Sequence, residues 1–483
     1  MAVHESLKVA YEDIAYVGRP NPNGHPQRLA AIGRLFGLEP PPVETARVLE
    51  VGCGDGANLL PMAVALPGAR FTGCDFSALL MSRARRMAEG LGVRNVELIE
   101  GDLRKVAATL GTYDYILAHG FYSWVPDDVR DALMAVIRDR LAPRGLAFVT
   151  FNVQPGFHVR RIARDLMRLE IGDEPDPLKR LAGVRRITGD MARAWSRMDG
   201  LPALLAPEMA TLPGRSDSAL YHDDLSGVNQ AYYFSQFVAH ASSCGLGFVS
   251  EAESGSLSAT GLPPRLQELI AKADPIAREQ YLDFARLRRF RQSVLARLDD
   301  VRRARLTPEA LERLHFSAAT PIVQERAAGE ARSVTGTAID VLVDRYPATY
   351  SRAQYADALV ARGFTPEEAH RAILRGCFTG AVDLYASALN LPATPGERPA
   401  VWPVARWQAT HEDVVTNLRH EGVRLDDPAA MALAIACDGT RDRRALTAAL
   451  AESRADAAAL VDHYLERFAL AALLEPTAPG DQR

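Results

Sequence analysis

Apolar runs alternate with amphipathic stretches between residues 46 and 151 of this chain. Short runs rich in β-branched and aromatic residues predict strands, and the longer stretches between them predict helices. The predicted strands are Ala46–Val51, Ala69–Cys74, Asn95–Ile99, Tyr113–Ala118 and Leu146–Phe151. The predicted helices are Ala57–Ala65, Ala78–Leu91 and Asp127–Leu141. Strands that alternate with helices in this way are typical of a doubly wound, Rossmann-like α/β domain with a parallel sheet.

The pattern changes after Phe151. Two charged amphipathic helices, Phe157–Glu170 and Pro177–Met198, follow without a strand between them and predict a helical insertion over about 157–218. A further amphipathic helix then leads into the mostly apolar run Leu246–Glu251, which predicts a sixth strand. The α/β domain is therefore expected to span residues 1–256. An insertion at the carboxyl edge of its sheet would cover a site there.

The second half of the chain predicts two smaller units. The stretch Pro263–Leu306 is strongly basic and predicts helices, whose arginines form either a solvated face or a docking face. Within Thr337–Ala386 the order helix, turn, helix and strand Ala381–Ala386 outlines a winged helix, so 257–395 is expected to be a helical and winged-helix-like middle (regulatory) domain. After a proline-rich linker, 396–483 is expected to be a C-terminal winged-helix-like domain. From Val404 to Pro476 it predicts strand, three helices and strand, with a turn at Asp438-Gly439-Thr440 between the first two helices.

Composition narrows the class of protein without identifying it. The 483 residues are 48% apolar and 24% charged, as in ordinary folded proteins, and the net charge of −4 argues against wholesale binding to nucleic acid or an anionic membrane. No apolar run approaches the ~20 residues of a membrane span, and the N-terminus resembles no secretory signal. The five cysteines form no CxxC pair, so neither a disulfide framework nor a metal site is predicted. A cytoplasmic protein is expected.

A glycine-rich turn follows the first predicted strand, in the stretch Val48-Leu-Glu-Val-Gly-Cys-Gly-Asp-Gly-Ala-Asn58. Its glycines allow tight turning and close approach of the backbone to a ligand. Asp75 ends the second strand, where a carboxylate can accept hydrogen bonds from both hydroxyls of a ribose. Asp102 ends the third strand in Glu100-Gly-Asp-Leu103, where its side chain and a backbone amide can read an adenine edge.

Together these motifs resemble the class I S-adenosylmethionine-dependent methyltransferases. The turn differs from the dinucleotide form G-x-G-x-x-G and offers no recognisable phosphate grip, which fits a ligand with a sulfonium and an amino acid. The resemblance implies S-adenosyl-L-methionine as the cofactor. By the same resemblance, Glu50, Gly52, Gly54 and Gly56 would line its methionine part, Asp75 and Phe76 would hold the ribose, and Asp102 and Leu103 the adenine.

The fourth strand ends in His119-Gly-Phe-Tyr-Ser-Trp-Val-Pro126, a position that faces the departing methyl group in this fold. Tyr122 and Trp124 are expected to form an aromatic wall, while core packing of Phe121 and Trp124 stays open. His119 and Asn152 are expected to orient an acceptor amine or relay its proton, although a purely structural His119 stays open. The [DN]PP[YF] signature and a Pro-Cys nucleophile are absent from this region, so methylation of DNA bases is not expected.

Longer stretches extend the resemblance beyond the fold. The runs His119–Pro126, 151–160, 221–225 and 279–284 together resemble bacterial methyltransferases with a so-called methyltransferase regulatory domain, a family that includes the rickettsial protein lysine methyltransferases. Phe151 and Phe157 stand where that family would have Tyr and Trp, which affects the identity of the acceptor rather than the fold. His222, Asp223 and Asp224 either support the insertion or contact the acceptor.

The main hypothesis is therefore a methyltransferase acting on a protein lysine amine, with the C-terminal units holding a bulky protein or peptide substrate. A small-molecule N- or O-methyltransferase is the second enzyme hypothesis, in which the insertion would be a lid. A cofactor-sensing adaptor protein is the non-enzyme alternative. Nucleic acid and membrane are not expected as partners, and the oligomeric state is left open.

Overall fold

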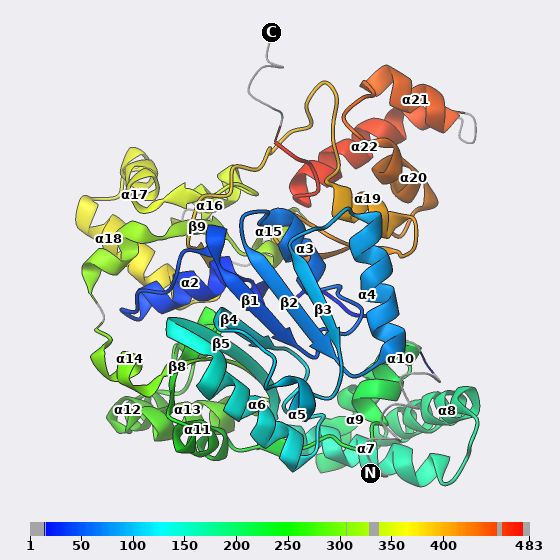
Figure 1. Ribbon diagram of the computed structural model, residues 1–483, viewed down its shortest axis with the longest axis vertical. Helices are drawn as coiled ribbons and strands as arrows, with labels where there is room; N and C mark the ends of the chain where they lie inside the picture. Colours follow the sequence, from blue (N-terminus) through cyan, green and yellow to red (C-terminus); the bar gives the residue numbers. More distant parts are fainter. Residues whose placement is uncertain (1–13, 15, 306, 328–337, 452–455, 477–483) are drawn as a thin grey trace.

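A mixed sheet of eight strands forms the centre of the computed structural model, which describes residues 14, 16–305, 307–327, 338–451 and 456–476 (Figure 1). Its strands are β1 (Arg47–Val51), β2 (Arg70–Asp75), β3 (Val96–Glu100), β4 (Tyr113–Ala118), β5 (Leu141–Val153), β6 (Ala231–Tyr232), β7 (Leu246–Glu251) and β8 (Phe290–Arg297). They lie in the order β3-β2-β1-β4-β5-β8-β7, with β6 beside β5. The strand order reverses between β1 and β4, and the crevice at such a point is where doubly wound sheets bind ligands.

The direction of the strands follows from their connections. The first five strands are parallel to one another, whereas β8 runs antiparallel between β5 and β7. Parallel neighbours are joined through α3 (Leu59–Ala65), α4 (Ala78–Gly90), α5 (Leu103–Val106) and α6 (Asp127–Arg140). The predicted doubly wound order of strands and helices is thus confirmed, including the sixth strand at Leu246–Glu251. The fifth strand begins earlier than predicted, at Leu141, directly after α6.

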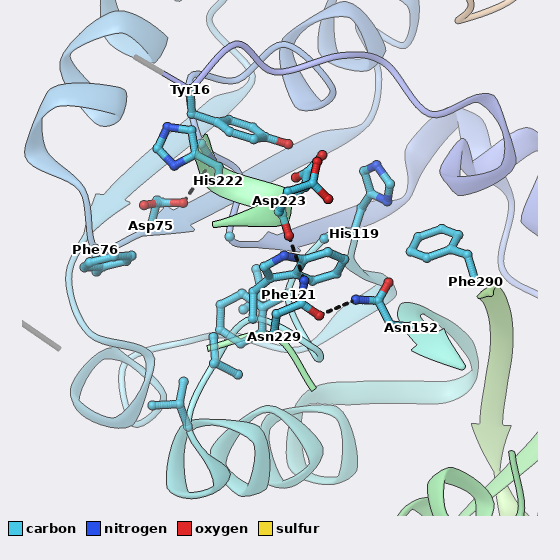
Figure 2. A pocket seen from close by; sticks show the side chains of 18 of the residues that line it. Tyr16, Asp75, Phe76, His119, Phe121, Asn152, His222, Asp223, Asn229 and Phe290 are labelled. Atoms are coloured by element: carbon cyan, nitrogen blue, oxygen red, sulfur yellow. Dashed lines mark hydrogen bonds between the residues drawn. The ribbon is translucent and has the colours of Figure 1, made fainter. Parts of the chain in front are cut away.

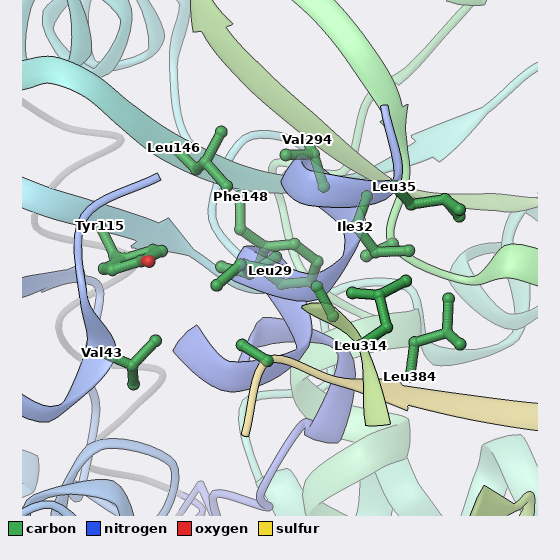
Figure 3. Close-up of a cluster of buried hydrophobic side chains, with 14 of the residues drawn as sticks. Leu29, Ile32, Leu35, Val43, Tyr115, Leu146, Phe148, Val294, Leu314 and Leu384 are labelled. Carbon is green, nitrogen blue, oxygen red and sulfur yellow. The ribbon is translucent and has the colours of Figure 1, made fainter. Parts of the chain in front are cut away.

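Two apolar cores cover the two faces of the sheet. On one face α6 and α11 (Phe234–Ser243) pack Ile137 and Phe237 against the sheet. On the other face α2 (Pro26–Leu35) inserts Leu29, which lies beside Phe148 and belongs to the same buried cluster as Leu384 (Figure 3). Full burial of each such side chain contributes about 1.5–3 kcal/mol. Because Leu384 belongs to the second half of the chain, the α/β domain and the middle domain share one core.

The helical insertion consists of α7 (Phe157–Ile171), α8 (Pro177–Trp195), α9 (Leu201–Thr211), α10 (Asp217–Ala219) and a π-helical turn, Leu220–Asp224. The two predicted helices are confirmed, and α9 is a helix that the pattern did not predict. Met167, Val184 and Met209 belong to a small core of its own. Figure 1 shows the insertion at the end of the sheet toward which the arrows of β1, β2 and β3 point, as expected for a cover over their carboxyl ends.

The prediction that Pro263–Leu306 is entirely helical is wrong. Helices α12 (Pro264–Lys272), α13 (Pro275–Arg286) and α14 (Leu298–Arg303) are present, but β8 lies between the last two and completes the sheet. The domain boundary predicted at residue 256 therefore falls inside the sheet, and a unit that contains all its strands extends at least to Arg297.

The arginines of this basic stretch were predicted to form a solvated face or a docking face, and Arg291 does neither. Its side chain is fully buried in β8. Its guanidinium donates to Glu251 Oε1 at 2.7 Å, to Glu279 Oε2 at 3.1 Å and to both oxygens of Asp283 at 2.9–3.1 Å. The basic run in the sequence did not indicate that Arg291 is buried in ion pairs, because the three carboxylates that pair with it lie elsewhere in the chain, in β7 and α13. This arginine anchors the last strand and is neither solvated nor available for docking.

The middle domain contains a three-stranded antiparallel sheet in the order β10-β9-β11. Its elements are β9 (His315–Ala318), α15 (Thr320–Ala327), α16 (Ala338–Arg345), β10 (Tyr350–Ser351), α17 (Arg352–Ala361), α18 (Pro366–Gly376) and β11 (Val382–Tyr385). Helices α17 and α18 with β11 confirm the predicted helix, turn, helix and strand. Thr337, where the prediction began, lies outside the described residues.

The C-terminal domain contains α19 (Pro403–Ala409), β12 (Val414–Thr416), β13 (Gly422–Arg424), α20 (Pro428–Ala436), α21 (Arg443–Ala451) and α22 (Ala457–Leu470). The strand predicted from Val404 is wrong: Pro403 opens α19, and proline is well suited to the first turn of a helix. The final predicted strand is reduced to one bridge between Val401 and Leu474. The turn at residues 438–440 lies between α20 and α21, as predicted. Among the described residues, none of the helices has the length and apolar character of a membrane span.

The turn between β12 and β13 inserts into the rest of the molecule. Arg419 is buried and donates to Ser317 Oγ at 2.9 Å and to Asp383 Oδ2 at 2.7 Å in the middle domain. The next residue, His420, hydrogen-bonds through Nε2 to Asn58 Oδ1 at 2.8 Å. Because Asn58 ends the glycine-rich turn, the C-terminal domain directly contacts the residues that surround the ligand crevice.

Candidate active site

The carboxyl ends of β1, β2, β4 and β5 open into a cavity of about 630 Å³ (Figure 2). This volume lies within the ~300–1,000 Å³ typical of small-ligand sites. The lining residues at or after the ends of β1, β2 and β3, called here the donor wall, include Gly52, Gly54, Asp75, Phe76, Asp102 and Leu103. The lining residues from the ends of β4 and β5, from the insertion and the loop after it, and from the N-terminal segment, called here the acceptor wall, include Tyr16, His119, Trp124, Asn152, Asp223 and Asn229. The cavity thus brings most of the predicted site residues together.

The glycine-rich turn needs its glycines for conformation and for space. Gly52 and Gly54 have φ angles of +74° and +55°, in the left-handed region that favours glycine. A Cβ atom at Gly52 would also lie 2.7 Å from the Phe121 ring. Both glycines line the cavity. Gly56 lies behind them and faces the side chains of α3 and α4.

Asp75, at the end of β2, links the turn to the second strand. Its Oδ2 accepts from the Gly54 N–H at 3.0 Å, and its Oδ1 accepts from the Ser77 N–H at 2.9 Å. Burial raises the pKa of Asp75, while these backbone hydrogen bonds act in the opposite direction. An ionised carboxylate has about four acceptor sites, so Asp75 can accept further hydrogen bonds from a ligand.

Glu50 supports the turn from beneath rather than lining the cavity. It is 2% exposed, and Asn58 Nδ2 donates to its Oε1 at 2.7 Å. Its Oε2 is buried without a hydrogen-bond partner among the described residues. Burial raises the pKa of Glu50 to about 8. The side chain is therefore largely protonated at neutral pH in this structure.

The far end of the donor wall is formed by the residues after β3. Asp102 caps the N-terminus of α5, where its Oδ1 accepts from the Arg104 N–H at 3.0 Å. Leu103 begins that helix, and Phe76 follows β2. All three predicted residues line the cavity. A carboxylate at this cap is favourable, because a helix N-terminus carries partial positive charge.

His119 follows β4 with its ring in one defined state. Its Nδ1 lies 3.1 Å from Asn21 Nδ2 and 3.3 Å from Thr150 Oγ1. Asn21 Oδ1 already accepts from the Asn23 N–H, so the NH₂ group of Asn21 faces His119. The ring accepts at Nδ1 and carries its proton on Nε2. Burial lowers the pKa of His119 to about 4, so the ring is mostly neutral at pH 7 and its Nε2–H can donate to a ligand.

Of the two aromatic residues predicted to form a wall, only one lines the cavity. Trp124 lines the cavity together with Phe121 and Phe290. Tyr122 does not line it: the side chain is buried in the core, where its hydroxyl lies 2.9 Å from His240 Nδ1. The aromatic wall beside the cavity is thus formed without Tyr122. Phe290 comes from β8, in the stretch predicted to be helical, and no motif singled it out.

Asn152 ends β5 and is held by a second asparagine. Asn152 Nδ2 donates to Asn229 Oδ1 at 2.8 Å, and Asn229 Nδ2 donates to the backbone carbonyl of Asp223 at 2.7 Å (Figure 2). Asn152 was predicted as a site residue, whereas Asn229 was not. Nothing in the sequence separates Asn229 from an ordinary loop asparagine.

Ion pairs connect the helices of the insertion to one another beside the cavity. Arg160 of α7 donates to both oxygens of Asp224 at 2.8 Å each and to Glu208 of α9 at 3.0 Å. Arg215 donates to Asp224 at 2.8 Å and to Asp223 at 2.9 Å. Burial raises the pKa of Asp223 to about 6 and also raises that of Asp224, against the opposing effect of the arginines. The carboxylates after His222 therefore both support the insertion and border the cavity.

The N-terminal segment closes the remaining side. The Tyr16 ring meets the His222 ring edge-on at 5.4 Å between centroids, and His222 Nε2 lies 2.7 Å from the Ile14 carbonyl. Burial lowers the pKa of His222. Tyr16 precedes β1 by about thirty residues, and the sequence contains no signal for its place here. Within the described ranges, no three His, Cys, Asp or Glu side chains form a group that could hold a metal ion.

Three family models match the chain. A methyltransferase domain matches residues 48–145, which contain the donor wall. A methyltransferase regulatory domain matches residues 216–297, which contain Asp223, Asn229 and Phe290. The C-terminal winged helix domain of PKMT, the protein lysine methyltransferases, matches residues 397–463. The last match covers most of the C-terminal domain described above.

Two curated relatives are uncharacterized proteins of Rickettsia prowazekii (strain Madrid E). One is 31% identical over 291 residues, covering 60% of this chain and 53% of that protein. The other is 29% identical over 242 residues, covering 50% of this chain and 96% of that protein. This chain therefore spans about half the length of the first relative.

The solved structure of PKMT2 from Rickettsia typhi shares the fold. It matches with a TM-score of 0.82 at 22% identity, covering 95% of this chain and 100% of that chain. The complex of PKMT2 with AdoHcy matches with the same score. The likeness extends over nearly the whole chain and so includes the insertion and both C-terminal units. The chain thus carries an S-adenosylmethionine-dependent methyltransferase domain, a methyltransferase regulatory domain and a PKMT-type C-terminal winged helix domain.

Proposed function

We propose that this protein transfers a methyl group from S-adenosylmethionine to a lysine amine of a protein substrate. The observation that carries the proposal is one cavity lined both by the methyltransferase motifs of the donor wall and by the polar and aromatic residues of the acceptor wall. The match to the PKMT winged helix domain and the fold shared with PKMT2 support a protein amine as the acceptor. In this proposal the middle and C-terminal domains hold the bulky substrate.

The donor wall fits S-adenosylmethionine, which supplies an electrophilic methyl group on a sulfonium. Gly52 and Gly54 leave the space that the methionine part needs, with Glu50 and Gly56 supporting the turn. Asp75, with acceptor capacity beyond its backbone hydrogen bonds, is assigned to the ribose hydroxyls together with Phe76. Asp102 and Leu103 are assigned to the adenine.

The acceptor wall addresses the main difficulty of a lysine substrate. With a reference pKa of about 10.4, a lysine is neutral in only about one molecule in a thousand at pH 7, a cost of roughly 4–5 kcal/mol. Desolvation beside Phe121 and Trp124 lowers the pKa of the amine and favours its neutral form. Asp223, a half-buried carboxylate on the lining, attracts the ammonium group as it enters. The protein otherwise acts by alignment and by excluding water.

The test is incubation of the full chain with isotope-labelled S-adenosylmethionine and a panel of candidate proteins, followed by mapping of methyl groups by mass spectrometry. We expect label on lysine side chains with the wild-type protein and none with the Gly54→Arg variant, whose new side chain fills the cofactor turn. Methylation confined to small metabolites would contradict a protein substrate. Cofactor binding without turnover on any acceptor would support a cofactor-sensing adaptor instead.

A further inference from the structure

We infer that Asn152 Oδ1 is the hydrogen-bond acceptor that orients the substrate amine, and that Asn229 is the positioning residue that aims it. This inference rests on the proposed function and names the group that selects an amine. It depends on three features of the structure: a fixed backbone, a fixed amide orientation and an oxygen that accepts no hydrogen bond from the described residues.

The backbone at Asn152 is fixed on both sides. In the central sheet Asn152 pairs with Ala231 of β6 on one side and with Phe290 of β8 on the other. Its N–H donates to Ser123 Oγ at 2.8 Å. A residue paired on both sides within a sheet holds its Cα in place, so the side chain has few ways to move away from the cavity.

The orientation of the Asn152 amide follows from a chain of hydrogen bonds that ends on a backbone carbonyl. The carbonyl of Asp223 can only accept, so the Asn229 atom 2.7 Å from it must be the NH₂ group. The other end of that amide, Asn229 Oδ1, can likewise only accept. The Asn152 atom 2.8 Å from it is therefore the NH₂ group, and the reverse orientation would place two oxygens against each other.

The consequence is that Asn152 presents its oxygen to the cavity. Among the described residues, no donor forms a hydrogen bond with Asn152 Oδ1, although the residue is only 6% exposed and lines the cavity. In Figure 2 this oxygen points away from Asn229, toward the side on which Phe290 lies. An acceptor left open in a mostly apolar recess favours a ligand that supplies an N–H or O–H group.

An amine that attacks a methyl group must aim its lone pair at the methyl carbon, and its N–H bonds then point elsewhere. A carbonyl oxygen that receives one N–H holds the nitrogen in that orientation. Being uncharged, it does so without the strong preference for the ammonium form that a carboxylate would impose. The same oxygen repels a carboxylate or phenolate nucleophile, so the arrangement selects amines over acidic oxygens.

The experiment measures steady-state methylation of one lysine-bearing protein substrate by wild-type protein, Asn152→Ala, Asn229→Ala and the double variant. We expect Asn152→Ala to lower kcat about 10–100-fold, the range for a hydrogen bond that counts fully in the transition state. Asn229→Ala frees the amide to rotate and should lower kcat roughly 2–10-fold. In the Asn152→Ala background, Asn229→Ala should change kcat less than about 2-fold, because there is no amide left to orient.

A further variant separates orientation from structural support. Asn152→Asp keeps an oxygen in place but adds a negative charge beside the amine, which raises the pKa of the amine. The rising, low-pH limb of the pH profile of kcat, which reports deprotonation of the amine, should therefore move to higher pH by about one unit. A purely structural Asn152 would leave that limb unchanged. AdoHcy affinity, measured by calorimetry, should stay within about 2-fold in every variant, as should kcat of Asn390→Ala, an exposed asparagine of the middle domain.

The outcomes separate this inference from the proposed function. If wild-type protein methylates no lysine in any substrate, the proposed function fails. If it methylates lysine and Asn152→Ala keeps kcat within about 2-fold, the function stands and the inference is overturned. A loss from Asn229→Ala that is equally large in the Asn152→Ala background would assign Asn229 to support of its loop and would also overturn the positioning role.

Discussion

The two walls of the cavity are built in different ways. The donor wall comes from one continuous stretch, Gly52–Leu103, and is held by contacts within it such as the Gly54 N–H on Asp75. The acceptor wall combines segments as distant as Tyr16, Asn152 and Phe290, and its part from the insertion is held by side-chain pairs such as Arg160 with Asp224. The donor wall can therefore form wherever the parallel strands form. The acceptor wall is complete only when the insertion is also in place.

A third region contacts the residues beneath the donor wall. His420 of the C-terminal domain hydrogen-bonds to Asn58, and Asn58 in turn donates to Glu50 beneath the glycine turn. The link to the acceptor wall runs through one more residue: Asn58 Oδ1 also accepts from the Asn21 N–H at 2.8 Å, and Asn21 Nδ2 lies 3.1 Å from His119 Nδ1. The C-terminal domain is therefore expected to influence cofactor affinity more than substrate orientation.

Asp75→Ala is the variant of the donor wall that should weaken cofactor binding most. The variant loses the hydrogen bonds from Gly54 and Ser77 as well as the proposed contact with the ribose. At about 1.5–3 kcal/mol for each hydrogen bond to a charged group, affinity for AdoHcy should fall at least about 100-fold. Calorimetry measures it, with Glu97→Ala on the exposed surface of the neighbouring strand as the control. Unchanged affinity in Asp75→Ala would contradict the assignment.

Asp224→Asn should disturb the acceptor wall and leave the donor wall intact. This change leaves Arg160 and Arg215 without their buried carboxylate, and breaking a buried ion pair typically costs about 3–5 kcal/mol. Hydrogen exchange should speed up over residues 157–224 and kcat should fall, while AdoHcy affinity changes little. Asp217→Asn, which breaks an exposed pair with Arg185, should have almost no effect. Equal loss of cofactor binding in Asp224→Asn would show that the walls are not independent.

The link from the C-terminal domain predicts a smaller effect. His420→Ala removes one buried hydrogen bond to Asn58, worth about 1 kcal/mol, so AdoHcy affinity should fall roughly 5-fold. The KM for the protein substrate should remain near the wild-type value. His463→Ala, an exposed histidine of the same domain, is the matched control. An effect on substrate KM alone would place the influence of this domain on the opposite wall.

The last prediction concerns the pH dependence of stability, with little effect on activity at neutral pH. The folded protein holds the pKa of His119 at about 4, below its ordinary value of 6.5, because burial disfavours the charged ring. The stability associated with the neutral ring is complete above pH 6.5 and is lost as the pH falls toward 4. His119→Gln should therefore flatten the fall of Tm between pH 6.5 and 4. A step near pH 6.5 in the activity profile that disappears in His119→Gln would contradict a ring that stays neutral.

A structural feature could be predicted from the sequence when it is determined by residues that are neighbours along the chain. The first five strands, the glycine turn and the strand-end aspartates were predictable. Each of them is indicated by a pattern within a few neighbouring residues: an apolar run, a group of glycines, or an acidic residue directly after a strand. Arg291 was misjudged within a basic run, since its partners Glu251, Glu279 and Asp283 are separated from it along the chain. Tyr122 was expected at the cavity because its position after β4 suggested it, but the rotation of its side chain into the core was not readable.

The sequence by itself determined the parallel part of the sheet, the donor wall and the type of cofactor, because these rest on short motifs that retain their geometry in any chain that folds this way. Only the tertiary structure decided which side chains face the donor across the cavity. Asn229 matters through one hydrogen bond to Asn152, and His420 through one to Asn58. Such pairings depend on the positions of the insertion and of the C-terminal domain in the folded protein. These positions are determined by the packing of the whole molecule.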